Sequence, residues 1–311
     1  MNAMWMKKSV PFRILCLSLI LTTFSRFSES APAEASRFDL YGNPSVFSDY
    51  LPRTGGETNY LKDTKTYQAK SYDERIKFII LHYTATDNET GKRALTIGNV
   101  SSHYLITSAA DEPVLSLVDD DKRAWHAGES MFYGRSGLND TSIGIEIINR
   151  GISAGKYLPY SEAQIQKTAL LLKHLIQKYH IEAKFVLGHS DIAPGRKLDP
   201  GPLFPWEHLY REYGIGAWYN EKDKKEFLDE IPEEKFAELK TLDFQKELYI
   251  YGYRIFLTDK LDAHTKNVIR AFQSHFHPQG MTGVMDRETY AILLALNKKY
   301  PGRKVPGSTT E

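Results

Sequence analysis

The sequence predicts an α/β protein with a mixed central β-sheet flanked by helices, followed by a small C-terminal domain of three helices. Short apolar runs that alternate with amphipathic segments predict the sheet and its helices. After residue 240 the apolar runs give way to three short helical patterns, which predict the second domain. A chain of 311 residues is long enough for two domains.

Residues 1–30 have the pattern of a secretory signal peptide, because basic residues precede the apolar run 14–21 and small residues follow it. That run is too short to cross a bilayer as a helix, although a retained membrane anchor stays open as an alternative. The single cysteine, Cys16, lies inside this leader, so a cleaved chain has no disulfide. Lipidation of Cys16 is the other alternative. We therefore expect export to the periplasm, with attachment to a membrane, such as the outer membrane, only through the leader.

The charge of the chain is balanced. It has 40 basic and 39 acidic residues and a net charge of +1. Nucleic-acid-binding proteins and proteins that bind anionic lipid usually carry a clear excess of basic residues. We therefore expect no nucleic-acid partner.

The first domain is expected over residues 73–220, after an extended lead-in at 31–72 that shows no periodic pattern. Ser161 opens a long amphipathic helix, and a short polar helix is expected within 87–99. The expected strands are short apolar runs bounded by polar residues: 77–83, 102–106, 114–118, 142–148 and 183–187.

The C-terminal part begins with a charged helical connector at 221–240. The second domain is expected over 241–300, before a tail at 301–311. Its three helices are expected at residues 242–249, 263–276 and 286–297.

Chemistry is expected at the loop that follows residues 183–187, because loops at the ends of rigid strands commonly carry functional groups. This loop, rich in Gly and Pro, contains His189, Lys197 and Asp199. His82 ends another strand, and Glu146 stands alone among isoleucines. Such a carboxylate either points to solvent or is buried for a functional reason, and the pattern leaves both open.

A catalytic zinc ion commonly has three protein ligands and one open position for water. His82, His189 and Asp199 would supply such a set if their separate strands and loops converge. A structural role for each histidine remains the alternative.

Five segments occur in the same order as in a known family: 80–84, 102–106, 125–128, 142–146 and 188–202. Over about residues 75–215 the chain closely resembles the zinc-dependent N-acetylmuramoyl-L-alanine amidases of the type-2 amidase family. That family shares its fold with animal peptidoglycan recognition proteins. The second domain makes the chain more similar to the periplasmic members of the family than to the cytosolic recycling enzymes.

The resemblance implies that His82, His189 and Asp199 bind one zinc ion. It implies that Glu146 is the catalytic carboxylate, which takes a proton from water as the lactyl carbonyl is attacked. Lys197 would stabilise the oxyanion. Trp125 and His126 are expected to contact substrate, with packing beneath the metal as an equal alternative. His103 and Tyr104 are expected to be structural.

The C-terminal helices resemble the peptidoglycan-binding domain 1 family, through Thr265, residues 271–273, Thr282, Gly283, Asp286 and Thr289. Such a module would hold the enzyme on peptidoglycan, unless it is purely structural. The expected partners are therefore peptidoglycan and muropeptides. Two other functions remain as alternatives: a peptidoglycan-binding protein without activity, and a metal-free glycosidase that uses Glu146 and Asp199.

Overall fold

The computed structural model describes residues 69–306. The predicted signal peptide and nearly all of the lead-in lie outside this range. The chain divides at Ser71 into two units, and the second unit, Tyr72–Glu311, contains all the elements below. Within the described range, none of the helices combines the length and the apolar character that crossing a membrane requires.

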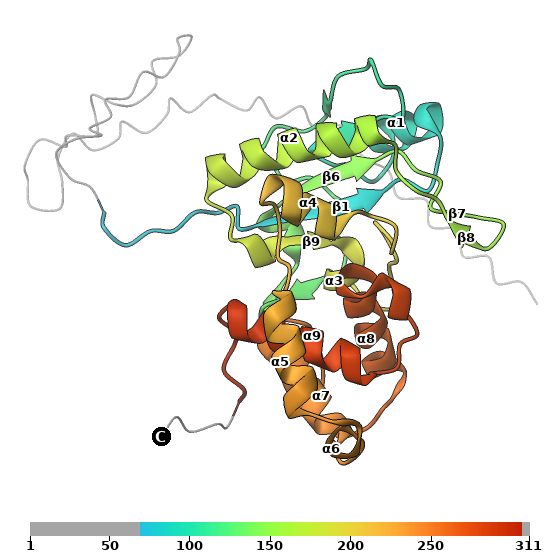
Figure 1. Cartoon of the computed structure of the whole chain (residues 1–311). Coiled ribbons are helices and arrows are strands. Elements are labelled where there is room, and N and C mark those ends of the chain that lie inside the picture. The colour runs from blue at the N-terminus through green and yellow to red at the C-terminus, as the bar shows by residue number, and fades with distance from the viewer. Residues whose placement is uncertain (1–68, 307–311) are drawn as a thin grey trace, which may run out of the picture. The chain divides into compact units, whose positions relative to one another are not determined.

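A five-stranded sheet forms the centre of the first domain, with the strand order β3-β2-β6-β1-β9 (Figure 1). Strands β2, β6, β1 and β9 are parallel to one another, and β3 is antiparallel to β2. The predicted mixed sheet is thus confirmed. Its strands are β1 (Phe78–Tyr83), β2 (Tyr104–Ile106), β3 (Leu115–Ser116), β6 (Ser142–Ile147) and β9 (Val186–Gly188).

Two small hairpins lie outside this sheet, β4 with β5 and β7 with β8. The first pairs Met131–Phe132 with Arg135–Ser136, and the second pairs Ile152–Ser153 with Lys156–Tyr157. Short 3-10 helices occur at Leu138–Asp140, Ala183–Phe185 and Pro278–Gly280.

Helix α2 (Glu162–Tyr179) lies across one face of the sheet (Figure 1). It begins at Ser161, whose side chain and that of Gln164 form a capping box. Leu172 and Leu175 on its inner side are fully buried in the same core as β1 and β6. Helix α1 (Asn88–Ile97) begins at Asp87, which accepts a hydrogen bond from the Thr90 N–H. The predicted long amphipathic helix is therefore present, as is the shorter one.

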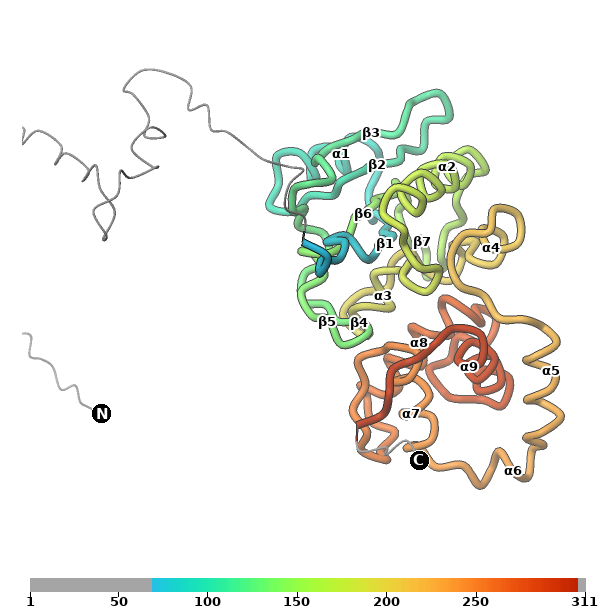
Figure 2. The backbone as a smooth tube through the Cα atoms, turned by 90° about the vertical axis from the view of Figure 1, so that its left-hand side faces the viewer, coloured from blue at the N-terminus to red at the C-terminus, as the bar shows by residue number. Residues whose placement is uncertain are grey.

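The C-terminal part consists of helices, as predicted (Figure 2). Asp262 and Asp286 cap α8 and α9 by accepting hydrogen bonds from backbone N–H groups in their first turns. Lys298 on α9 forms ion pairs with two acidic residues of α5. The helices after the sheet are α3 (His189–Ile192), α4 (Trp206–Tyr213), α5 (Glu221–Glu230), α6 (Glu233–Ala237), α7 (Thr241–Tyr251), α8 (Ala263–Phe276) and α9 (Arg287–Lys299).

Three neighbouring parallel strands, β6, β1 and β9, end at the same edge of the sheet. His82 on β1 is directly paired with Glu146 on β6. His189 follows β9 at once and opens α3. Because the carboxyl ends of parallel strands share one edge, the fold brings together three polar residues that are far apart in the sequence.

Candidate active site

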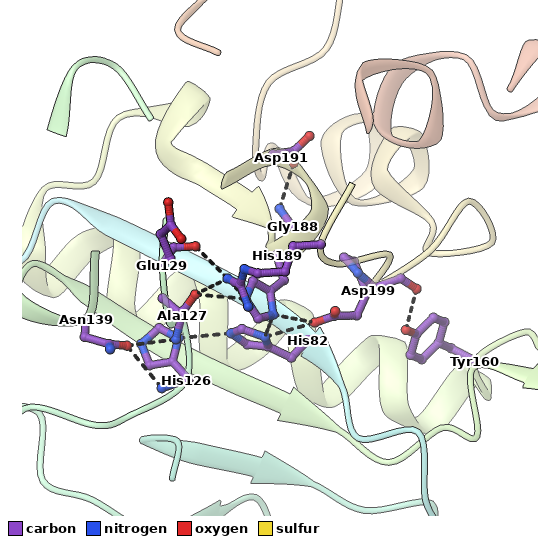
Figure 3. Close-up of polar contacts among 12 residues, drawn as sticks. His82, His126, Ala127, Glu129, Asn139, Tyr160, Gly188, His189, Asp191 and Asp199 are labelled. Carbon is purple, nitrogen blue, oxygen red and sulfur yellow. Dashed lines mark hydrogen bonds and ion pairs between the residues drawn. The ribbon is translucent and has the colours of Figure 1, made fainter. Parts of the chain in front are cut away.

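The side chains of His82, His189 and Asp199 converge at this edge (Figure 3). His82 Nδ1 lies 2.9 Å from His189 Nδ1, and Asp199 Oδ2 lies 3.0 Å from each of these nitrogens. A point above such a triangle can lie about 2.1 Å from all three atoms, which is the usual distance from zinc to its nitrogen and oxygen ligands. In residues 69–306 this is the one cluster of three such side chains that could hold a metal ion.

The second nitrogen of each imidazole is held by a hydrogen bond. His189 Nε2 donates to the Ala127 carbonyl oxygen at 3.1 Å. His82 Nε2 lies 3.0 Å from His126 Nδ1, and His126 Nε2 lies 3.2 Å from Ser142 Oγ. Since Ser142 Oγ donates to a backbone carbonyl, the hydrogen-bond pattern assigns protons to the Nε2 atoms of His126 and His82. Both Nδ1 lone pairs are then free for a metal ion.

The His126 ring can reach His82 because residue 144 is glycine. A Cβ atom at Gly144 would lie 2.4 Å from the ring of His126, far inside any normal contact distance. The backbone N–H groups of His126 and Ala127 are fixed by Asn139 Oδ1. His103 is also buried, and its Nδ1 accepts a hydrogen bond from the Gly144 N–H. The glycine of the 142–146 motif thus has a direct role in building the site.

Burial and close contacts set the charges of His82 and Asp199. It lowers the pKa of His82 to about 4, with a further contribution from the neighbouring His189. Burial alone would raise the pKa of Asp199, but its close contacts with His189 and His82 hold it well below the ordinary value. The site therefore presents a neutral His82 and an ionised Asp199 near neutral pH, which are the protonation states that a zinc ion requires.

Glu146 lies beside this cluster and is not satisfied by the protein. Its Oε2 atom is buried and has no hydrogen-bond partner within the part of the chain that the structure describes. Burial, and then the charge of Asp199, raise the pKa of Glu146 to about 8. The sequence left open whether Glu146 points to solvent or inward. In the structure its carboxyl group points inward, toward the groove, with Oε2 buried. A carboxyl group with a pKa near neutrality can both accept and donate a proton at physiological pH.

A groove of about 410 Å³ opens over the cluster, and all seven predicted site residues line it. Lys197 is half-buried, and its side chain makes no hydrogen bond or ion pair with any residue in the range 69–306. Trp125 is 55% exposed and faces the groove, with the guanidinium carbon of Arg123 4.2 Å from the centre of its ring. His126, by contrast, is buried below His82. Of the two predicted substrate contacts, Trp125 is therefore the one whose ring is exposed in the groove.

A further group of residues fixes the loop that carries His189, and two of its members, Tyr253 and His275, were not predicted from the sequence. The fully buried Asp191 accepts hydrogen bonds from the Gly188 N–H at 2.8 Å and from the Tyr253 hydroxyl at 2.6 Å. His275 Nδ1 lies 2.8 Å from Asp191 Oδ2, the oxygen that also accepts from the Gly188 N–H. Tyr253 and His275 belong to the C-terminal helical part, so this part directly supports the loop that carries His189. The sequence carried one signal of this contact, the histidine at position 275 among the apolar residues of α8.

Two regions of the chain match known protein families. Residues 72–202 match the family described as N-acetylmuramoyl-L-alanine amidase, and residues 240–293 match the family described as a putative peptidoglycan binding domain. The N-acetylmuramoyl-L-alanine amidase AmiD of Escherichia coli is 42% identical over 250 residues, which are 78% of this chain and 89% of AmiD.

Solved structures agree with this assignment. AmpDh3 from Pseudomonas aeruginosa in complex with anhydromuramic pentapeptide is 41% identical, with a TM-score of 0.72 over 78% of this chain and 99% of AmpDh3. Escherichia coli AmiD in complex with the substrate anhydro-N-acetylmuramic acid-L-Ala-D-gamma-Glu-L-Lys is 40% identical, with a TM-score of 0.71 over 79% of this chain and 97% of AmiD. The predicted family and fold are thereby confirmed, and the chain belongs to the N-acetylmuramoyl-L-alanine amidase family.

Proposed function

We propose that this amidase holds one zinc ion with His82, His189 and Asp199 and hydrolyses the amide bond between N-acetylmuramic acid and L-alanine in muropeptides or peptidoglycan. The observation that carries the proposal is the triangle of His82 Nδ1, His189 Nδ1 and Asp199 Oδ2, with edges of 2.9, 3.0 and 3.0 Å. Two imidazoles, one carboxylate and an open side are the donor set of a catalytic zinc site.

A zinc ion bound there would lower the pKa of a water molecule and polarise the substrate carbonyl. Glu146 then accepts the proton of the attacking water. Because its pKa lies near 8, Glu146 can give that proton to the nitrogen of the departing L-alanine. Lys197, which has no partner of its own among the described residues, donates a hydrogen bond to the carbonyl oxygen as negative charge develops on it.

The substrate is proposed from the relatives and from the groove. AmiD and AmpDh3 were solved with anhydromuramyl peptides, and this chain covers nearly the whole of both structures. We place the catalytic domain at residues 73–220 and a peptidoglycan-binding domain at 241–300, which the family match at 240–293 supports. The predicted leader makes export to the periplasm part of the proposal.

The two alternatives are less well supported. A peptidoglycan-binding protein without activity would have no use for a complete ligand set with an unpartnered carboxylate beside it. A glycosidase would need Asp199 as a free carboxylate, but its Oδ2 atom is engaged by both histidines.

The test is digestion of purified muropeptides with the full chain, followed by mass spectrometry of the products. We expect free stem peptides that begin with L-alanine, loss of the reaction in a chelator, and its recovery on addition of zinc. Cleavage between sugars, or peptide release that chelation leaves unchanged, would contradict the proposal.

A further inference from the structure

A second pocket adjoins the active-site groove and is built jointly by the two domains. Its volume is about 120 Å³, and it lies between the loop that follows His189 and helix α8. Lys197 and Leu198 line both this pocket and the groove. The groove and the pocket therefore meet at Lys197 and Leu198.

The pocket is positively charged. Lys197 faces it from the first domain and Arg270 from α8, and no Asp or Glu is among the lining residues. The Arg270 guanidinium is held by weak hydrogen bonds to Asn267 Oδ1 at 3.4 Å and to the Thr282 carbonyl oxygen at 3.3 Å. Neither cation forms an ion pair with any residue between 69 and 306. Two uncompensated cations on one small pocket favour an anionic ligand.

The neutral polar groups of the pocket can also donate hydrogen bonds. Ser190 and Ser274 are buried residues that line it from opposite sides. Neither hydroxyl makes a hydrogen bond within the described residues, although buried hydroxyl groups usually have a partner. Neither oxygen is fully enclosed, since neither is among the enclosed side-chain atoms that lack a partner. Free hydroxyls beside two cations are the groups that bind a carboxylate.

We propose that this pocket binds a carboxylate of the stem peptide, so that Arg270 of the C-terminal domain determines substrate specificity in the catalytic reaction. The inference rests on the amidase function proposed above. The substrate bound to AmiD contains a γ-linked D-glutamate, a linkage that leaves the α-carboxylate free, and its last residue carries another carboxylate. Sugar hydroxyls carry no charge, so a glycan would leave both cations of the pocket uncompensated.

The test compares Arg270→Gln with Lys266→Gln on two substrates. Lys266 is an exposed cation one turn earlier on α8 that does not line the pocket, so its variant controls for the loss of one positive charge. The substrates are an anhydromuramyl tripeptide with free stem carboxylates and the same compound with those carboxylates amidated.

For the free acid we expect Arg270→Gln to raise KM roughly tenfold, the effect of losing a hydrogen bond to a charged group, while kcat stays nearly unchanged. Amidation should raise the KM of the wild type by a similar factor and add little in Arg270→Gln. Lys266→Gln should behave as the wild type. Ser274→Ala, which keeps every charge, should raise the KM for the free acid a few-fold.

Equal effects of the Arg270 and Lys266 substitutions would overturn the proposal, because they would indicate only a general charge effect. So would an Arg270→Gln variant that still discriminates between the two substrates as strongly as the wild type. If the wild type releases no peptide from either substrate, the amidase function itself fails, and this outcome is distinct from the other two.

Discussion

Glu146→Gln separates catalysis from metal binding. The substitution keeps the shape of the side chain and removes its ability to accept a proton. Glu146 is not among the three groups that converge at the metal site. We therefore expect zinc content near one per chain and a fall in kcat by a factor on the order of 10² to 10⁴, the usual contribution of a general base.

The same variant has a predictable effect on stability. Burial raises the pKa of Glu146 from 4.5 to about 8, so the folded chain binds more protons than the unfolded chain between these values. Through this group, the free energy of unfolding falls as pH rises across that window. At about 1.4 kcal/mol per pKa unit, the loss between pH 5 and pH 9 is at most about 4 kcal/mol.

The assay is denaturant unfolding of chelated protein at pH 5 and at pH 9, for the wild type and for Glu146→Gln. We expect the variant to gain stability relative to the wild type as the pH rises, by up to the same amount. Glu230→Gln, which changes an exposed carboxylate, is the matched control and should follow the wild type at both pH values. Full turnover in Glu146→Gln would refute its catalytic role, and parallel stability curves would refute its buried ionisable state.

Three further substitutions test other parts of the site. His189→Ala should lose both zinc and activity, measured by metal analysis and peptide release, and retention of a full zinc equivalent would exclude it as a ligand. Tyr253→Phe removes one hydrogen bond to Asp191 and should weaken zinc binding roughly tenfold while the protein stays folded; unchanged affinity in a zinc competition assay would remove this support from the site. Trp125→Ala should raise KM several-fold and leave kcat nearly unchanged, because the exposed ring lines the groove and is not among the groups proposed to act on the reacting bond; a loss confined to kcat would contradict that assignment.

Sequence patterns were sufficient to locate the strand ends that form the site. Apolar runs ending at His82 and just before His189 predicted two buried strands. The first is present as β1, whereas the second, predicted at 183–187, is a strand only at Val186–Gly188 (β9), and Ala183–Phe185 forms a 3-10 helix instead. A lone carboxylate among isoleucines identified Glu146 as a candidate. The alternation of residues along the strand could not decide whether its side chain faces solvent or the interior. The parallel pairing of β1 with β6, which puts Glu146 beside His82, follows from the tertiary fold.

Contacts between distant segments could not be predicted in this way. His126 supports His82 through a hydrogen bond across 44 positions, which spacing alone cannot distinguish from a substrate contact. Asp191 meets Tyr253 and His275 across 62 and 84 positions. These pairs depend on how the helical domain packs against α3, and local periodicity carries no information about that packing.

The central claim is that one zinc ion is bound by three residues that the sheet brings together. Diffraction from crystals of zinc-loaded, active protein, collected at the zinc absorption edge, tests it most directly. We expect one strong anomalous peak about 2.1 Å from His82 Nδ1, His189 Nδ1 and Asp199 Oδ2. A zinc peak at another position, with these three atoms left without metal in active protein, would contradict the claim.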